Sequence, residues 1–263
     1  MRRRWGIPVA TLAIVGGSML AAGSAAAASS AAPRSGHMIV QPGGPAAHLV
    51  RPFVSVRGGV RHASSTNWSG YAAHSGTFTS VSASWVEPTG HCSGSGHQYS
   101  SFWVGLDGYN SNSVEQTGSG VDCSGGSPRY YSWYEMFPKF PVNFSNPVSP
   151  GDHFTGSVTY TGGGNFTLRL SDTTKGWTHT EHKSLGSAAR SSAEVIIEAP
   201  SSGTGVLPLA DFGTVNITSA KVNGSSIGSH SPTKITMVSG RTAKDSVSGL
   251  SGSQNFSATW LHS

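Results

Sequence analysis

The sequence of 263 residues predicts an all-β fold, a β-sandwich or barrel formed by one domain of about 200 residues. Short runs rich in β-branched and aromatic residues recur along the chain. Turn signals such as Gly162-Gly163-Gly164 and Asn223-Gly224 separate these runs. No segment keeps an apolar period of 3.6 residues, which argues against amphipathic helices.

The N-terminus has the organisation of a secretory signal peptide. Arg2, Arg3 and Arg4 precede an apolar stretch over residues 7–22, and the small residues 23–28 follow as a cleavage region. A membrane anchor is the alternative, but the stretch is short for a bilayer and ends in Ala and Ser. No later segment approaches the ~18 unbroken apolar residues that a membrane helix needs. We therefore expect residues 1–28 to be a signal peptide, the protein to be secreted, and no membrane association after its removal.

A low-complexity segment comes next. Residues 29–63 are rich in Ala, Pro, Gly and Arg, and Phe53 is their only aromatic residue. Such a composition packs poorly and is typical of a propeptide or linker. We expect the folded domain to cover residues 64–263.

Nine short runs within this domain predict strands. They are residues 78–86, 100–106, 130–136, 153–160, 165–170, 193–197, 214–218, 233–237 and 255–261. A shorter run, residues 113–115, precedes Gln116.

Charge excludes a nucleic-acid partner. All 12 acidic residues lie between Glu87 and Asp245, whereas seven of the 17 basic residues lie between Arg2 and Arg61. Residues 64–263 therefore hold ten basic and 12 acidic residues, a difference of −2. The high isoelectric point belongs to the leader, and the domain offers no basic patch for nucleic acid.

Cys92 and Cys123 are the two cysteines of the chain. An even pair in an exported protein most simply forms one disulfide. A metal site would need more ligands at suitable spacing, and the His residues are scattered, without an HExxH pattern. We expect neither a metal nor another cofactor.

Alternation along the predicted strands brings polar and aromatic side chains to one face. In residues 102–107, the apolar Phe102, Val104 and Leu106 share one face, while Trp103, Gly105 and Asp107 share the other. By the same rule Tyr131, Trp133 and Glu135 align, and so do Glu194, Ile196 and Glu198. Acids beside Trp rings predict a groove for a polymer, although an ordinary solvated face would have the same pattern.

Several segments carry a resemblance to a known family. They are residues 67–71 (NWSGY), 103–108 (WVGLDG), 115–118 (EQTG), 133–138 (WYEMFP), 193–198 (AEVIIE) and 210–215 (ADFGTV). Their order and spacing resemble those of the glutamic peptidases, also called eqolisins, in a secreted, bacterial-type member. The resemblance spans about residues 67–260, and the sequence departs from the family at Val195, where a Trp is usual.

The resemblance implies a β-sandwich of two large antiparallel sheets, of the jelly-roll or concanavalin-like kind. It implies a secreted acid endopeptidase that acts on proteins or peptides, which we expect to be a monomer. The family's catalytic glutamine corresponds to Gln116. Its catalytic glutamate corresponds to Glu198, with Glu194 as the second choice. Trp103, Asp107, Trp133, Glu135 and Glu194 match groove positions and are expected to contact substrate.

These residue types suit amide hydrolysis. An ionised Glu198 would take a proton from water and return it to the leaving nitrogen. The Gln116 amide would accept a hydrogen bond from the water and donate one to the developing oxyanion. Neither a metal nor a covalent intermediate is needed.

Two other functions fit parts of the pattern. A jelly-roll glycoside hydrolase could pair Glu135 with Glu198 or Glu194, and a carbohydrate-binding sandwich could use the same Trp residues without catalysis. A Ser/His/Asp enzyme is disfavoured because no Gly-x-Ser-x-Gly stands at a strand-to-helix turn.

Overall fold

A computed structural model describes residues 55–57, 60–203 and 205–263. The expected signal peptide and most of the segment 29–63 therefore lie outside the described residues. In the described ranges, no helix is both long and apolar enough to cross a bilayer.

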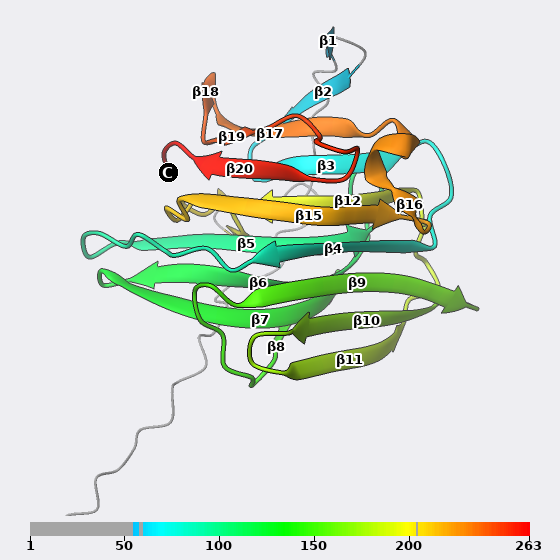
Figure 1. Cartoon of the computed structure of the whole chain (residues 1–263), viewed down its shortest axis with the longest axis horizontal. Coiled ribbons are helices and arrows are strands. Elements are labelled where there is room, and N and C mark those ends of the chain that lie inside the picture. The colour runs from blue at the N-terminus through cyan, green and yellow to red at the C-terminus, as the bar shows by residue number, and fades with distance from the viewer. Residues whose placement is uncertain (1–54, 58–59, 204) are drawn as a thin grey trace, which may run out of the picture. The chain divides into compact units, whose positions relative to one another are not determined.

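Two large sheets lie face to face, as Figure 1 shows. The ten-stranded sheet has the order β1-β2-β17-β3-β12-β5-β6-β7-β8, and β18 pairs with β17. Its strands are β1 (Ser55–Arg57), β2 (Val60–Ser65), β17 (Thr233–Ser239), β3 (Trp68–His74), β12 (Ser192–Glu198), β5 (His97–Leu106), β6 (Val114–Ser124), β7 (Ser127–Phe137), β8 (Val142–Asn143) and β18 (Thr242–Ala243).

The eight-stranded sheet has the order β11-β10-β9-β4-β15-β20-β19, and β16 pairs with β15. Its strands are β11 (Trp177–Ser184), β10 (Asn165–Asp172), β9 (His153–Gly162), β4 (Ser80–Val86), β15 (Thr214–Val222), β20 (Phe256–Trp260), β19 (Asp245–Val247) and β16 (Ser225–Ser226). A short hairpin of β13 (Ser201–Ser202) and β14 (Gly205–Val206) and one 3-10 turn, Ile227–His230, complete the described elements. The expectation of a sandwich of two large antiparallel sheets is confirmed, and the pairing of β17 with β2 is parallel.

The main core lies between the sheets and follows the predicted alternation. Phe102, Val104 and Leu106 of β5 and Val195 and Ile197 of β12 all belong to it. Side chains of the eight-stranded sheet meet them, among them Trp85, Phe154, Phe166, Leu168, Val215 and Ile217. Burying such side chains stabilises the fold by about 1.5–3 kcal/mol each.

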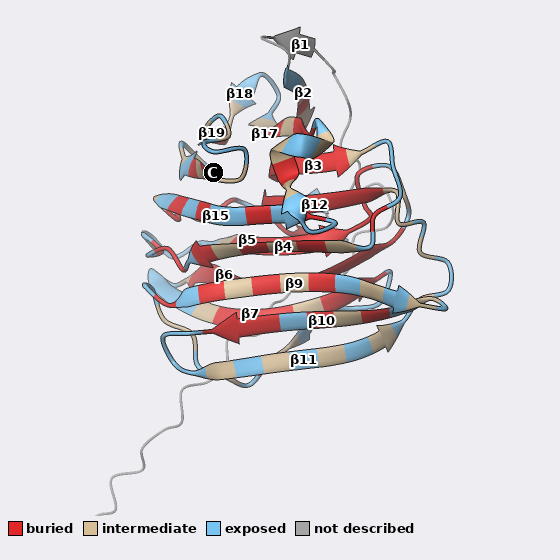
Figure 2. Cartoon of the chain, turned by 45° about the vertical axis from the view of Figure 1, so that its right-hand side comes forward, coloured by how far each residue is buried: buried red, intermediate tan, exposed pale blue. Residues whose placement is uncertain are grey.

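Figure 2 shows that burial differs between central and peripheral strands. All seven residues of β12 are buried, whereas β11 alternates between half-buried and exposed residues. A second apolar cluster explains this, because it lies on the face of the ten-stranded sheet turned away from the other sheet. We call this surface the outer face. The cluster contains Ala63, Trp68, Ala72, Trp103, Tyr109, Val114, Tyr131, Trp133, Phe137, Ile196 and Ile235.

Several strands differ from the sequence-based expectation. β3 and β11 were not among the predicted strands, because β3 holds no Val, Ile or Thr and β11 is largely polar. β6 has 11 residues where the sequence suggested a run of three, since Gly118 and Gly120 lie inside it and Gly is unfavourable in strands. The sheet also includes β2, which begins before the expected domain boundary at residue 64.

The predicted disulfide between Cys92 and Cys123 is confirmed. Cys123 lies near the end of β6, and Cys92 lies in the loop that leads into β5.

Candidate active site

Four adjacent strands, β12, β5, β6 and β7, carry the candidate residues on the outer face. Register places Glu194 opposite Gly105, Gly105 opposite Gln116, and Gln116 opposite Glu135. In a parallel row, Trp103 lies opposite Gly118, and Gly118 opposite Trp133. The expected convergence of Trp103, Trp133, Glu135, Glu194, Glu198 and Gln116 on one face is therefore what the strand register produces.

Glycines let the indole rings lie against the sheet. A Cβ on Gly118 would stand 2.2 Å from the Phe102 carbonyl oxygen and 2.6 Å from the Trp103 Cβ. A Cβ on Gly105 would stand 2.8 Å from Trp103 Cζ3. Real Cβ contacts are not this short, so both positions require Gly to keep the Trp103 ring in place.

Glu198 is a buried carboxyl group held by side-chain donors. Trp103 Nε1 donates to one oxygen at 2.8 Å, and Asn67 Nδ2 donates to the other at 3.3 Å. Burial raises the pKa of Glu198 to about 7, while hydrogen bonds from Trp103, Trp68 and Asn67 oppose that rise. The rings of Trp68 and Trp103 pack edge to face with centroids 5.0 Å apart.

Gln116 has one fixed and one free functional atom. Its Nε2 donates to Glu135 Oε2 at 2.5 Å. Its Oε1 is buried and has no partner among the described residues. Burial and then the Glu198 charge raise the pKa of Glu135 to about 8, and the Gln116 hydrogen bond opposes them.

Glu135 connects Gln116 with Glu198. No hydrogen bond joins Gln116 directly to Glu198 in the described part of the chain. Their strands are two apart, about 10 Å, and Glu198 is offset by four residues along β12. Alternation places both side chains on the outer face, and the Glu198 charge contributes to the raised pKa of Glu135, to which Gln116 donates.

Glu194 differs electrostatically from Glu198. It is fully buried. Burial, together with the charges of Asp107 and Glu115, raises the pKa of Glu194 well above its ordinary value, and hydrogen bonds from Ser192 and the Tyr109 backbone N–H oppose the rise. Neighbouring carboxylates therefore disfavour ionisation of Glu194, whereas none contributes to the raised pKa of Glu198.

Asp107 anchors a loop. Its carboxylate accepts from the backbone N–H groups of Arg190 at 2.7 Å and Ser191 at 2.8 Å, and from the Ser191 hydroxyl at 3.2 Å. Its backbone φ of 69° lies in the left-handed region, which Asp tolerates better than most residues. These bonds direct Asp107 toward the residues just before β12.

Asn67 and Trp68 belong to the site, although neither was among the residues predicted to act there. The segment 67–71 resembles the family's opening segment, which was the available signal. What the sequence could not show is that Asn67 reaches Glu198, 131 residues away.

Among the residues that the structure describes, no three His, Cys, Asp or Glu side chains are arranged to hold a metal ion. The arrangement is instead a carboxyl group and a carboxamide beside aromatic rings. Such a pair can accept a proton from water and stabilise a developing oxyanion.

The comparisons with known proteins agree with this geometry. The model of the peptidase A4 family matches residues 66–260. Aspergillopepsin-2 from Aspergillus niger is 30% identical over 203 residues, which cover 68% of this chain and 72% of that protein. The crystal structure of scytalido-glutamic peptidase with a transition state analog inhibitor has a TM-score of 0.65 at 27% identity. That of SCP-B, an eqolisin in complex with the tripeptide Ala-Ile-His, has a TM-score of 0.61 at 26% identity. Each match covers 74% of this chain and 98% of the solved chain.

Proposed function

Since the chain belongs to the peptidase A4 family and is a glutamic-type peptidase, we propose that it is a secreted acid endopeptidase using Gln116 and Glu198. The observation that carries the proposal is the pairing of a buried, donor-held carboxyl group with a carboxamide whose Oε1 is free. The solved relatives with a transition state analog and a tripeptide support a peptide as substrate.

The reaction begins with a water molecule between Gln116 and Glu198. Gln116 Oε1 accepts one water hydrogen, and ionised Glu198 takes the other as the water oxygen attacks the scissile carbonyl carbon. One N–H of Gln116 stays on Glu135, and the second N–H donates to the oxyanion. Glu198 then returns its proton to the amide nitrogen, the C–N bond breaks, and a carboxyl product and an amine leave.

Glu198 is a better base than Glu194 for an electrostatic reason. A base must ionise, and the three donors that oppose the rise in the pKa of Glu198 favour its carboxylate form. Glu194 also receives hydrogen bonds, from Ser192 and the Tyr109 backbone, but the charges of Asp107 and Glu115 oppose its ionisation. We therefore assign Glu198 as the base and Glu194 as a second carboxyl group of the outer face.

The remaining residues take supporting roles. Trp103 orients Glu198, and Glu135 holds the Gln116 amide. Trp133 lies in the same row as Trp103 and offers its ring to the peptide. Asp107 fixes the loop at Arg190 and Ser191, so we assign it to loop positioning instead of substrate contact.

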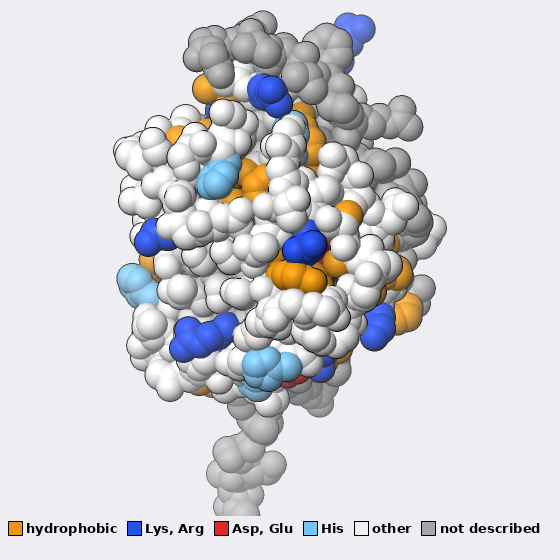
Figure 3. All heavy atoms as spheres, turned by 90° about the vertical axis from the view of Figure 1, so that its right-hand side faces the viewer, with side chains coloured by type: hydrophobic (Ala, Val, Ile, Leu, Met, Phe, Trp, Pro, Cys, Tyr) orange, Lys and Arg blue, Asp and Glu red, His pale blue; other side chains and the backbone are white. Residues whose placement is uncertain are grey.

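Burial of acids supports operation in acid. Ten of the 12 acidic side chains are buried, and the two ion pairs found among the described residues involve only Asp152 and Glu181. Figure 3 shows the consequence on one face, where basic and His side chains reach the surface and acidic ones scarcely do. Buried acids without cations are best tolerated when protonated. At Glu198 the hydrogen bonds from Trp103, Trp68 and Asn67 lower the pKa relative to burial alone, which favours the ionised base at lower pH.

Export and trimming complete the proposal. The segment 1–28 has the signal-peptide pattern, and residues 29–63 have a propeptide composition. Because β2 pairs along β17 and Ala63 is buried, we place the trimming site before Val60. N-terminal sequencing of secreted protein tests this, and a secreted active form that retains Met1 would contradict it.

Digestion of casein from about pH 3 to 8 tests the function. Parallel reactions contain pepstatin, a serine-protease inhibitor or a chelator, and a polysaccharide serves as a second substrate. We expect casein cleavage in acid that none of the three compounds abolishes. Loss of activity with the chelator or the serine inhibitor, or hydrolysis of the polysaccharide alone, would overturn the proposal.

A further inference from the structure

The row of residues that contains Gln116 continues across the sheet to a basic edge. Each residue of this row lies opposite the next on the neighbouring strand. From β7 to β2 the row is Glu135, Gln116, Gly105, Glu194, Ala72, Thr233 and Arg61. Arg61 therefore stands at the end of the line that passes through the proposed catalytic amide.

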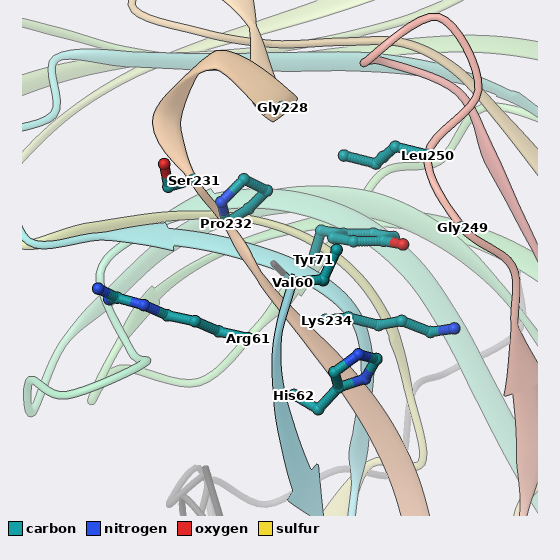
Figure 4. Close-up of a pocket in the computed structure, with 10 residues that line it drawn as sticks. All are labelled: Val60, Arg61, His62, Tyr71, Gly228, Ser231, Pro232, Lys234, Gly249 and Leu250. Carbon is teal, nitrogen blue, oxygen red and sulfur yellow. The ribbon is translucent and has the colours of Figure 1, made fainter. Parts of the chain in front are cut away.

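The Arg61 side chain lies on the outer face. Ala63, two residues further along β2, packs in the outer-face cluster with Ile235, so alternation places Arg61 on the same side. Arg61, His62 and Lys234 all line one cavity of about 600 Å³, and Figure 4 shows the Arg61 side chain extending to the opposite side from those of His62 and Lys234. The Arg61 side chain therefore lies on the outer face, and the Lys234 side chain lies on the opposite face of the sheet.

His74, Tyr109 and Thr233 adjoin Arg61. The His74 ring stacks on Tyr109 with centroids 4.6 Å apart and planes 13° apart. His74 Nε2 makes a 2.8 Å hydrogen bond with the Thr233 hydroxyl, and Nδ1 makes a 3.1 Å hydrogen bond with the exposed Ser75 hydroxyl, which a bound carboxylate would have to displace. Burial and then the Arg61 charge lower the pKa of His74, so the two groups are close enough to interact. The His74 ring is thereby held in a fixed position beside the guanidinium.

These two cationic side chains have no anionic partner. Neither Arg61 nor His74 forms an ion pair among the described residues. The carboxyl group nearest along the row is Glu194, whose pKa is raised well above its ordinary value by burial and by the charges of Asp107 and Glu115. A proton on His74 would place a second positive charge beside Arg61, and this repulsion contributes to the lowered pKa of His74. An anion bound between them would relieve that repulsion.

We propose that Arg61 and His74 form a subsite for an acidic side chain of the peptide substrate. The inference rests on the proposed function and adds a specificity to it. Neighbouring strands are about 4.8 Å apart and an extended peptide rises about 3.3 Å per residue. A peptide that follows the row from Gln116 therefore reaches the strand of His74 after about four residues and Arg61 after about seven. Tyr109 and Thr233 supply the rim of this subsite.

Paired peptide substrates test the subsite. One residue is varied between Glu and Gln at each position up to seven residues on either side of a fixed scissile bond, at about pH 5. We expect Glu to raise kcat/KM about tenfold at one position and not elsewhere, as for a charge-assisted hydrogen bond. Arg61→Gln and His74→Gln should each reduce the ratio of kcat/KM for the Glu peptide to kcat/KM for the Gln peptide toward one.

Lys234→Gln and His62→Gln are the matched controls, because these residues lie on β17 and β2, next to Thr233 and Arg61, and their side chains point to the opposite side from Arg61. Their Glu-to-Gln ratio should equal that of the parent protein. An equal loss in the controls, or an unchanged ratio in Arg61→Gln, would overturn the subsite. Calorimetric binding of the same peptides to Glu198→Gln protein repeats the comparison without turnover. Absence of peptide cleavage refutes the proposed function, whereas cleavage without the Glu preference refutes only the subsite.

Discussion

The side-chain amide of Gln116 donates a 2.5 Å hydrogen bond to the carboxyl group of Glu135. This contact fixes which end of the carboxamide faces Glu135 and leaves Oε1 without a partner among the described residues. Glu198 acts on the same Glu135 through its charge. Glu135 is therefore the group through which the two proposed catalytic side chains are coupled.

Glu198→Gln should abolish turnover while peptide binding survives. The change keeps the shape of the side chain and removes the base, which is worth about 10²–10⁴ in kcat. Glu194→Gln is the control, because Glu194 lies on the same face of β12 outside the proposed catalytic pair, so the change should leave most of kcat. Steady-state kinetics and peptide calorimetry measure both variants. If Glu194→Gln is inactive and Glu198→Gln is not, the two roles are reversed.

Glu135→Gln and Glu135→Leu should separate hydrogen bonding from charge. The Gln side chain still offers an oxygen to Gln116 Nε2, so activity in acid should be retained. The Leu side chain offers none, so the amide loses its orientation and kcat should fall by about 10²-fold. The pKa of Glu135 is about 8, so the decline of kcat/KM near that pH should disappear in Glu135→Gln. Equal activity of both variants in acid would show that the Gln116–Glu135 contact is dispensable.

Trp103→Phe should raise the pKa of Glu198. It removes the Nε1–H that donates to the carboxylate at 2.8 Å and keeps an aromatic ring. A hydrogen bond to a charged group is worth about 1.5–3 kcal/mol, so the acid limb of kcat/KM should move up by about one pH unit. Trp133→Phe is the control, because Trp133 Nε1 donates to the Ser119 carbonyl at 3.4 Å. An equal shift in both variants would refute the assignment of that limb to Glu198.

Glu87→Gln should stabilise the protein at neutral pH and not in acid. Burial is the main reason that the pKa of Glu87 rises from 4.5 to about 8, and the charges of Asp152 and Asp172 also raise it. The hydrogen bonds from Ser119 and Trp85 act in the opposite direction. The pKa of Glu87 is higher in the folded protein than in the unfolded chain. Its contribution to stability is therefore complete below about pH 4.5 and is lost as the pH rises toward 8. At pH 7 the penalty for Glu87 is about 3 kcal/mol, at about 1.4 kcal/mol per pKa unit.

Urea unfolding at pH 3.5 and pH 7 measures this difference. Glu181→Gln is the matched control, because Glu181 is partly exposed and pairs with Lys183 at 2.9 Å. It should change the free energy of unfolding by no more than about 1 kcal/mol at either pH. A Glu87→Gln protein as unstable at pH 7 as its parent would show that Glu87 does not limit neutral stability.

Removing the disulfide should lower the free energy of unfolding by about 3–4 kcal/mol. Cys92 and Cys123 are 31 residues apart, and closing a loop of that length restricts the unfolded chain by this amount. Urea unfolding of the Cys92→Ala/Cys123→Ala variant measures the loss. Reduction of the disulfide should lower the free energy of unfolding of the parent protein by the same amount and should leave that of the variant unchanged. A parent protein insensitive to reduction would contradict the estimate.

Local alternation was enough to predict the faces of the central strands. Phe102, Val104 and Leu106 point into the core, and Trp103 lies on the outer face, because the side-chain period of a strand is fixed by its backbone geometry. Motif order likewise indicated Gln116 and Glu198. Gly-rich β6 and polar β11 were harder, because their pairing with neighbouring strands overrides weak strand propensity.

Contacts between distant segments were decided only by the tertiary structure. Asn67 reaches Glu198, and Arg61 shares a row with Gln116, because strands far apart in sequence become neighbours in the sheet. The burial of ten acids has the same origin, since a carboxyl group is desolvated by what the fold packs around it. The sequence by itself determined which residue types and strand faces were available. The tertiary structure decided which of those residues meet and which protonation state they hold, because register and desolvation depend on the whole sheet.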